Sequence, residues 1–142
     1  METLREIVLK QRLPTIEEYR SLCESVGWGE MINFAAAEEG LPRSSTAVVA
    51  ENPQGTAVGM GRIVGDEAVY FYIQDIVVRP AYQGQGIGTR ILTALFDYLR
   101  AQAPPQAFIG LFSVPEAVDF YRNFTLEQRD LIGIFTVREL IA

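Results

Sequence analysis

The chain has 142 residues, of which 49% are apolar and 21% are charged, and its formal net charge is −6. This length suits one compact domain over residues 1–142, and the apolar share excludes general disorder. The acidity and the lack of basic runs argue against nucleic acid as a partner. No apolar run reaches the roughly 18 residues of a membrane-spanning helix, so no membrane partner is expected.

Histidine is absent, and Cys23 is the only cysteine. This composition excludes histidine-based catalytic triads, histidine metal sites and a structural zinc site, so we expect no metal. A single cysteine cannot form an intrachain disulfide, which fits a reducing compartment. Residues 1–6 lack the basic segment and apolar block of a secretory signal. We therefore expect a cytoplasmic protein.

The first half of the chain predicts two helices and an antiparallel meander. Thr15 followed three residues later by Glu18 is a capping box, and Gly27 is a natural end for the helix that it opens. Turn residues separate the β-prone runs that follow. The predicted elements are a strand at 6–11, helices at 16–26 and 30–39, and strands at 46–50, 57–64 and 68–78.

The second half begins with a strongly patterned helix, in which apolar residues recur at helical spacing over 87–100. A strand is predicted at 107–112. Ser113 followed by Glu116 reads as a second capping box that opens a further helix. The tail predicts two weaker strands within 126–140, around Gly133. The order of elements indicates an α/β mixed sheet with helices on both faces.

A Gly-rich turn, Gln83-Gly84-Gln85-Gly86-Ile87-Gly88, joins the third meander strand to the patterned helix. The N-terminus of a helix presents unpaired N–H groups and partial positive charge, and glycines let a phosphate approach the backbone closely. The alternative is a tight connection that needs glycine only for its conformation. A dinucleotide fingerprint fails because Thr89 stands at its last glycine position, and no P-loop Gly-Lys-Ser/Thr is present.

The pattern Gln-x-x-Gly-x-Gly after an apolar strand resembles the acyl-CoA signature of the GNAT N-acetyltransferase superfamily. Residues 72–80 look like that family's preceding strand, and residues 117–124 look like its later helix. The resemblance is firm over 57–124. It implies a GNAT-like acyl-CoA acyltransferase fold, with a mostly antiparallel sheet of six or seven strands whose central strands splay. It also implies transfer of an acetyl group from acetyl-CoA to a primary amine, by direct attack in a ternary complex.

The resemblance implies two sets of cofactor-binding residues. The Gly-rich turn would hold the CoA pyrophosphate through backbone N–H groups, and the strand before it would pair with the pantetheine amides. A backbone N–H near Val77 would face the thioester carbonyl. The implied residues are Ile76, Val77, Val78, Gln83, Gly84, Gln85, Gly86, Ile87, Gly88 and Thr89.

Two residues are candidates for catalysis. Tyr121 matches the family's tyrosine beside the CoA sulfur, where its hydroxyl can protonate the leaving thiolate. The alternative is an aromatic side chain packed on the sheet. Asp75 stands among apolar residues and is a candidate general base, or else a group whose hydrogen bonds steady the splayed strand.

The acceptor site is implied less directly. Gln74 and Tyr72 alternate onto a face that could line an amine pocket, and Glu30 is a weaker candidate base. Family members commonly build the acceptor site from their opening helices, which adds Trp28. The expected acceptor is a small-molecule or peptide amine.

One departure from the family pattern is Thr125, where a glycine often follows the tyrosine helix. Threonine there must avoid the left-handed conformation or adopt it at a cost of about 1 kcal/mol or more. This departure motivates an alternative function, a non-catalytic acyl-CoA-binding sensor or scaffold of the same fold. An exposed strand in the tail also suggests a homodimer.

Overall fold

The computed structural model describes residues 6–141. The expectation that residues 1–6 are not a secretory signal therefore falls mainly on residues outside the described range. The chain divides into two compact units, Met1–Ile109 and Gly110–Ala142. The elements, in chain order, are β1 Val8–Lys10, α1 Ile16–Ser25, α2 Phe34–Gly40, β2 Thr46–Glu51, β3 Ala57–Gly65, β4 Tyr70–Val78, α3 Ile87–Gln102, β5 Phe108–Gly110 and α4 Val118–Arg122.

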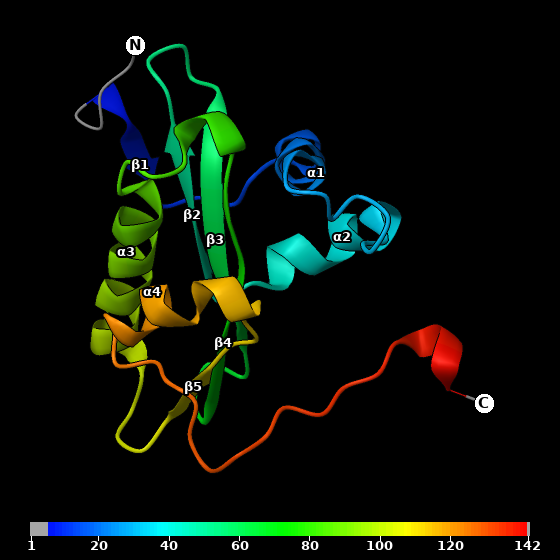
Figure 1. Cartoon of the computed structure of the whole chain (residues 1–142), viewed down its shortest axis with the longest axis vertical. Helices are drawn as coiled ribbons and strands as arrows, with labels where there is room; N and C mark the ends of the chain where they lie inside the picture. The colour runs from blue at the N-terminus through cyan, green and yellow to red at the C-terminus, as the bar shows by residue number, and fades with distance from the viewer. Residues whose placement is uncertain (1–5, 142) are drawn as a thin grey trace. The chain divides into compact units, whose positions relative to one another are not determined.

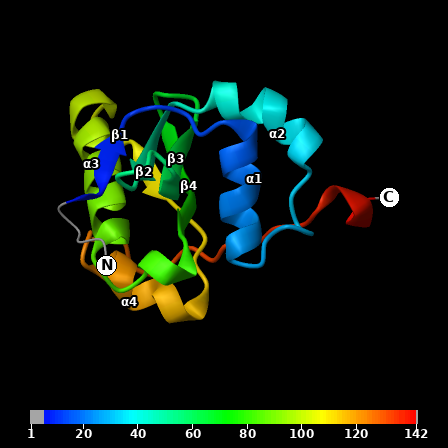
Figure 2. The same cartoon turned by 90° about the horizontal axis from the view of Figure 1, so that it is seen from above.

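The described strands, which are labelled in Figure 1, form one sheet with the order β1-β2-β3-β4-β5. β1 to β4 pair antiparallel with their neighbours, which is the predicted meander. Seen from above, α3 covers one face of the sheet and α1 covers the other (Figure 2). This confirms the predicted α/β sheet with helices on both faces. The described sheet has five strands, so the implied six or seven were too many.

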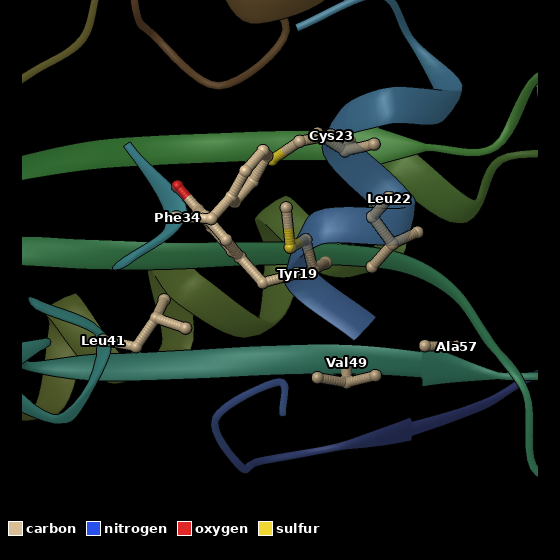
Figure 3. Close-up of a cluster of buried hydrophobic side chains, with 9 residues drawn as sticks. Tyr19, Leu22, Cys23, Phe34, Leu41, Val49 and Ala57 are labelled. Atoms are coloured by element: carbon tan, nitrogen blue, oxygen red, sulfur yellow. The ribbon is translucent and has the colours of Figure 1, made fainter. Parts of the chain in front are cut away.

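The face under α1 and α2 holds one hydrophobic cluster. Tyr19, Leu22 and Cys23 of α1 are at most 3% exposed and pack with Phe34 of α2 (Figure 3). The capping box is present as predicted: the Thr15 side chain accepts from the Glu18 N–H, and the Glu18 carboxylate accepts from the Thr15 N–H. Burial of these side chains is the main force that holds α1 to the sheet.

The opposite face packs against α3 through its apolar stripe, which includes Ile87, Ile91 and Leu95. β3 meets this stripe with glycine. A Cβ added at Gly61 would lie 2.6 Å from the Ile76 Cδ1 and 2.8 Å from the Ile91 Cγ2. The missing side chain therefore lets the helix approach the sheet closely.

Three local predictions were wrong. α2 begins at Phe34 rather than near Glu30, because Asn33 caps it by accepting from the Ala36 N–H. The second capping box does not form: Ser113 donates its hydroxyl to the carbonyl of Val114, and no side chain caps α4. The tail over 126–140 holds no strand and only a short 3-10 helix, Arg138–Leu140.

Within the second unit, Thr125 adopts the left-handed conformation, with φ of 61°. Its N–H donates to the carbonyl of Arg122, and the next N–H, of Leu126, donates to the carbonyl of Tyr121. These bonds close α4 as a glycine would. Threonine therefore adopts this conformation rather than avoiding it, at a cost of about 1 kcal/mol or more.

Acid should destabilise the first unit through one ion-pair cluster. Arg12 donates to both carboxylate oxygens of Glu18, at 2.8 and 2.9 Å, and to Glu51 at 2.9 Å. The Arg12 hydrogen bond is the main reason why the pKa of Glu18 falls from 4.5 to about 2. Because the folded-state pKa is lowered, this stabilisation is present above about pH 4.5 and is lost as pH falls toward 2.

Replacing Arg12 with Gln should therefore flatten the fall in unfolding free energy between pH 5 and 2, which urea titrations at several pH values would measure. Arg100→Gln is the matched control, because its pair with Asp97 is 69% and 70% exposed and contributes little. Equal acid profiles for Arg12→Gln and the parent protein would contradict this assignment.

Candidate functional site

The turn between β4 and α3 has the backbone of an anion site. Gly84 and Gly86 are left-handed, with φ of 78° and 86°. Gly86 is the N-cap of α3, and no side chain caps this helix. The first N–H groups of α3 are therefore not taken by a capping side chain, and they carry the positive end of the helix dipole. A Cβ added at Gly84 would meet nothing within 4 Å, so that side of the turn is open.

Side chains fix this turn to the sheet. Gln83 donates through Nε2 to the carbonyl of Val78 at 2.9 Å. Arg79 donates through Nε to the carbonyl of Ala57 at 2.8 Å and through Nη2 to Ser21 Oγ at 2.9 Å. These bonds connect the turn to β3, β4 and α1. The sequence singled out Gln83 for its backbone, and it did not indicate this side-chain role.

A bulge interrupts β4 shortly before the turn. Met60 pairs with Val77 but Arg62 pairs with Gln74, so one residue of β3 faces two of β4. Asp75 lies in the bulge with φ of 57°. Its Oδ2 accepts from Arg62 Nε at 2.7 Å and from the Tyr19 hydroxyl at 3.0 Å. The sequence indicated Asp75 as a candidate residue but indicated neither the bulge nor Arg62.

The strand segment that follows the bulge leads directly into the turn. Ile76 packs toward α3, and Val77 is buried in the cluster under α1. β5 joins the start of β4, where the Phe108 N–H donates to the carbonyl of Val69 at 2.8 Å. β5 has three residues, about 10 Å of strand, whereas β4 has nine. The far end of β4, at Val78, therefore extends beyond the length of β5.

The predicted acceptor residues occupy two places. Tyr72 stacks on Tyr70 with ring centroids 6.3 Å apart, and Gln74 pairs with Arg62 across the sheet. Trp28 and Glu30 lie in the connection between α1 and α2. Trp28 is half-buried against the α1 cluster, while Glu30 is an exposed turn residue.

A groove of about 370 Å³ lies between α1 and α2. The Arg20 guanidinium stands 4.7 Å above the Phe34 ring there. The residues that line the groove are Ile16, Glu17, Arg20, Phe34, Ala35 and Glu38. None of the four predicted acceptor residues is among them.

Tyr121 belongs to the second unit, where it lies on α4. It is half-buried, and its ring meets that of Phe120 edge-on at 5.1 Å. Burial raises the pKa of Tyr121 above its usual value of 10.0, so the phenol stays protonated at neutral pH.

A family model described as the acetyltransferase (GNAT) family matches residues 13–124, which include the turn, the bulge and most of the sheet. The chain belongs to the GNAT acetyltransferase family. This finding confirms the resemblance that the Gly-rich turn indicated.

Named relatives and solved structures agree with this membership. A histone acetyltransferase TAP1 of Glycine max is 30% identical over 136 residues, which cover 84% of this chain and 56% of the relative. A probable acetyltransferase of unknown function from methicillin-resistant Staphylococcus aureus matches with a TM-score of 0.85 at 27% identity, over 92% of this chain and 98% of that one. A GNAT family acetyltransferase of Streptococcus pneumoniae matches with a TM-score of 0.76 at 27% identity, over 93% and 98% of the two chains.

The chain spans little more than half the length of some curated relatives. It covers 54% of a chloroplastic GCN5-related N-acetyltransferase of Arabidopsis thaliana, to which it is 29% identical over 140 residues, or 84% of this chain. Within residues 6–141, none of the helices has the length and apolar character that crossing a membrane requires.

Proposed function

We propose that this chain is an acetyl-CoA-dependent N-acetyltransferase that acts on a primary amine by direct attack, as one domain over residues 1–142. The observation that carries the proposal is the uncapped N-terminus of α3, opened by two left-handed glycines in a GNAT family chain. Pyrophosphate fits this backbone, because oxygen atoms can approach glycines closely and accept from the N–H groups. Acetyl-CoA supplies the acetyl group as a reactive thioester.

Two stretches of backbone would bind acetyl-CoA. The first is the turn, through the N–H groups of residues 83–89. The second is residues 76–78, whose edge beyond β5 suits pairing with an extended amide chain, as in strand addition. A backbone N–H near Val77 would donate to the thioester oxygen. A preset donor at about 2.7–3.1 Å stabilises the charge that develops there during attack.

Tyr121 is the proposed general acid, because its half-buried phenol keeps the proton that a leaving thiolate needs. Asp75 and Glu30 remain the two candidates for removing a proton from the amine. The Asp75 side chain is only 13% exposed and is paired with Arg62, whereas Glu30 is an exposed residue. Glu30 is therefore the more accessible of the two carboxylates. The chain's only cysteine, Cys23, is buried, and burial raises its pKa to about 11, which supports direct attack over a covalent cysteine intermediate.

The proposed acceptor is a small-molecule or peptide amine, with Gln74, Tyr72, Trp28 and Glu30 as the candidate contacts. A relative named as a histone acetyltransferase supports a peptide amine as one class to assay. The alternative function is an acyl-CoA-binding sensor or scaffold without turnover. The departure at Thr125 suggested this alternative, but Thr125 adopts the left-handed backbone that glycine would provide there. The argument for a sensor or scaffold is therefore weaker.

Two further parts of the proposal concern assembly and location. A homodimer was expected from an exposed strand in the tail, and residues 126–140 hold no strand, so this part of the proposal rests on the apolar side chains of the tail, such as Ile134. A cytoplasmic location is supported by the single, unpaired cysteine. Two relatives are named as chloroplastic, which is also a compartment to examine.

Thermal unfolding with and without acetyl-CoA tests the proposal, with NAD and ATP as control ligands. A ligand at 100 times its Kd that binds only the folded state adds about 2.7 kcal/mol, and it should raise the melting temperature by several degrees. A rise with acetyl-CoA alone supports the site. Turnover on a panel of amines then separates the enzyme from the sensor, and a rise with NAD alone would contradict both.

A further inference from the structure

Asp75, Arg62 and Tyr19 form a cluster that we call the Asp75 brace. Both donors reach the same carboxylate oxygen, Oδ2, at 2.7 Å from Arg62 Nε and 3.0 Å from the Tyr19 hydroxyl. The side chains of Arg62 and Asp75 are only 19% and 13% exposed. Arg62 also donates through Nη1 to Ser44 Oγ at 3.1 Å. The brace therefore connects β4 to β3, to α1 and to the segment before β2.

The brace holds a residue whose backbone is unfavourable. Asp75 has φ of 57°, which asparagine, aspartate and glycine tolerate better than other residues. Such a conformation persists where the surroundings determine it fully. On the other face of the sheet, Ile76 fills the space above Gly61, against Ile91 of α3. The bulge is thus fixed from both faces, by a charged pair on one and by close packing on the other.

The position of the bulge gives the brace its consequence. Residues 76–78 begin immediately after Asp75, and they lead through Arg79 into the Gly-rich turn. A bulge of one extra residue re-aims the strand that follows it. The direction of the backbone N–H and C=O groups of residues 76–78 therefore depends on how Asp75 is held.

We propose that Asp75 is a positioning residue, which with Arg62 and Tyr19 holds residues 76–78 in the direction that acyl-CoA binding requires. This inference rests on the proposed function. Asp75 then acts through the backbone rather than by accepting the proton of the amine. Its carboxylate is committed to two donors and largely covered, which suits an anchor better than a group that must meet each new substrate.

Hydrogen exchange in the ligand-free protein tests the brace without reference to any ligand. Asp75→Asn keeps the left-handed tolerance and removes the charge, and Arg62→Gln removes the other half of the pair. Each should speed exchange of the Val77 amide, which faces Met60 of β3, at least tenfold. The double variant should add less than twofold because the pair acts as one unit. Tyr19→Phe, which removes one hydroxyl, should give a smaller increase of about threefold.

The matched control is Glu51→Gln. Glu51 lies at the end of β2, is 8% exposed and forms an ion pair with Arg12, and this substitution removes its charge. Glu51→Gln should leave exchange of the Val77 amide unchanged. Unchanged exchange in Asp75→Asn or in Arg62→Gln, or an equal rise in the control, would overturn the brace. If both charge variants fail to fold, Tyr19→Phe still tests the brace, because it removes only one hydroxyl. Unchanged amide exchange in Tyr19→Phe would then overturn the brace.

Acetyl-CoA binding and turnover then show what the brace does. Calorimetry should give an acetyl-CoA Kd about tenfold weaker in Asp75→Asn and Arg62→Gln and unchanged in Glu51→Gln, with the pH profile of kcat unmoved in all three. A loss of kcat above a hundredfold in Asp75→Asn alone, with normal Kd, would identify Asp75 as the proton acceptor and overturn the inference. Parent protein that binds no acetyl-CoA would refute the proposed function instead, while the exchange rates would still decide the brace.

Discussion

Replacing Gly84 with alanine should weaken acetyl-CoA binding at least tenfold while leaving the fold intact. Gly84 is left-handed, with φ of 78°, and the space where a Cβ would stand is open to 4 Å. In the proposed complex, that space holds a phosphate oxygen in contact with the backbone. A methyl group there separates the oxygen from its N–H donors, and a tenfold loss of affinity corresponds to about 1.4 kcal/mol.

A matched glycine elsewhere separates binding from folding. Gly55, in the turn between β2 and β3, has φ of 80° and equally open space around it. Gly55→Ala therefore carries the same backbone cost as Gly84→Ala, about 1 kcal/mol. The two variants should melt at similar temperatures, and only Gly84→Ala should lose affinity in calorimetry. Equal affinities in the two variants would show that the open side of Gly84 does not face the cofactor.

The fold was predictable where local pattern and packing agree. Short stretches of sequence were enough to predict the apolar stripe of α3, the capping box at Thr15 and the turn at Gly27. The tail shows the opposite case. Its run from Leu131 to Leu140 has strand-forming residues, yet a strand exists only with a partner to pair with, and the sequence does not state one.

One part of the candidate site was also predictable from the sequence, and another part was not. The Gly-rich turn was predictable because glycines before an amphipathic helix form a continuous motif. The bulge was not, because Asp75 sits in an uninterrupted β-prone run and nothing in that run marks a left-handed residue. The partners of Asp75 lie 13 and 56 residues away in sequence, so their contact depends on strand register and helix docking. The acid itself was identifiable, but its environment depended on the tertiary structure.

The same distinction affects how each role can be tested. Backbone roles, such as those of the turn and residues 76–78, respond to changes in shape and are best read by ligand affinity. Side-chain chemistry, such as the proposed role of Tyr121, responds to loss of a single proton and is best read by kcat. A variant that changes one without the other therefore assigns its residue to one of these two classes.

Tyr121→Phe should lower kcat about a hundredfold and leave the acetyl-CoA Kd within about twofold, because general acids typically contribute 10²–10⁴ in rate. Steady-state kinetics on an accepted amine, together with calorimetry, would measure both. Tyr98→Phe is the matched control: Tyr98 is a half-buried tyrosine of α3 whose pKa burial also raises. It should keep the parent kcat, and equal kcat in both variants would remove Tyr121 from the mechanism.

The dependence of kcat on pH in the parent protein shows whether Tyr121 acts as an acid or as a base. Burial raises the pKa of Tyr121 above 10.0, so the phenol keeps its proton at pH values where a free tyrosine would begin to lose it. An acid must be protonated to act, so kcat should show no loss from this group until the pH passes about 10. Tyr121→Phe should abolish that alkaline loss. A kcat that instead rises as the phenol ionises would identify Tyr121 as a base, because only the phenolate can accept a proton from the amine.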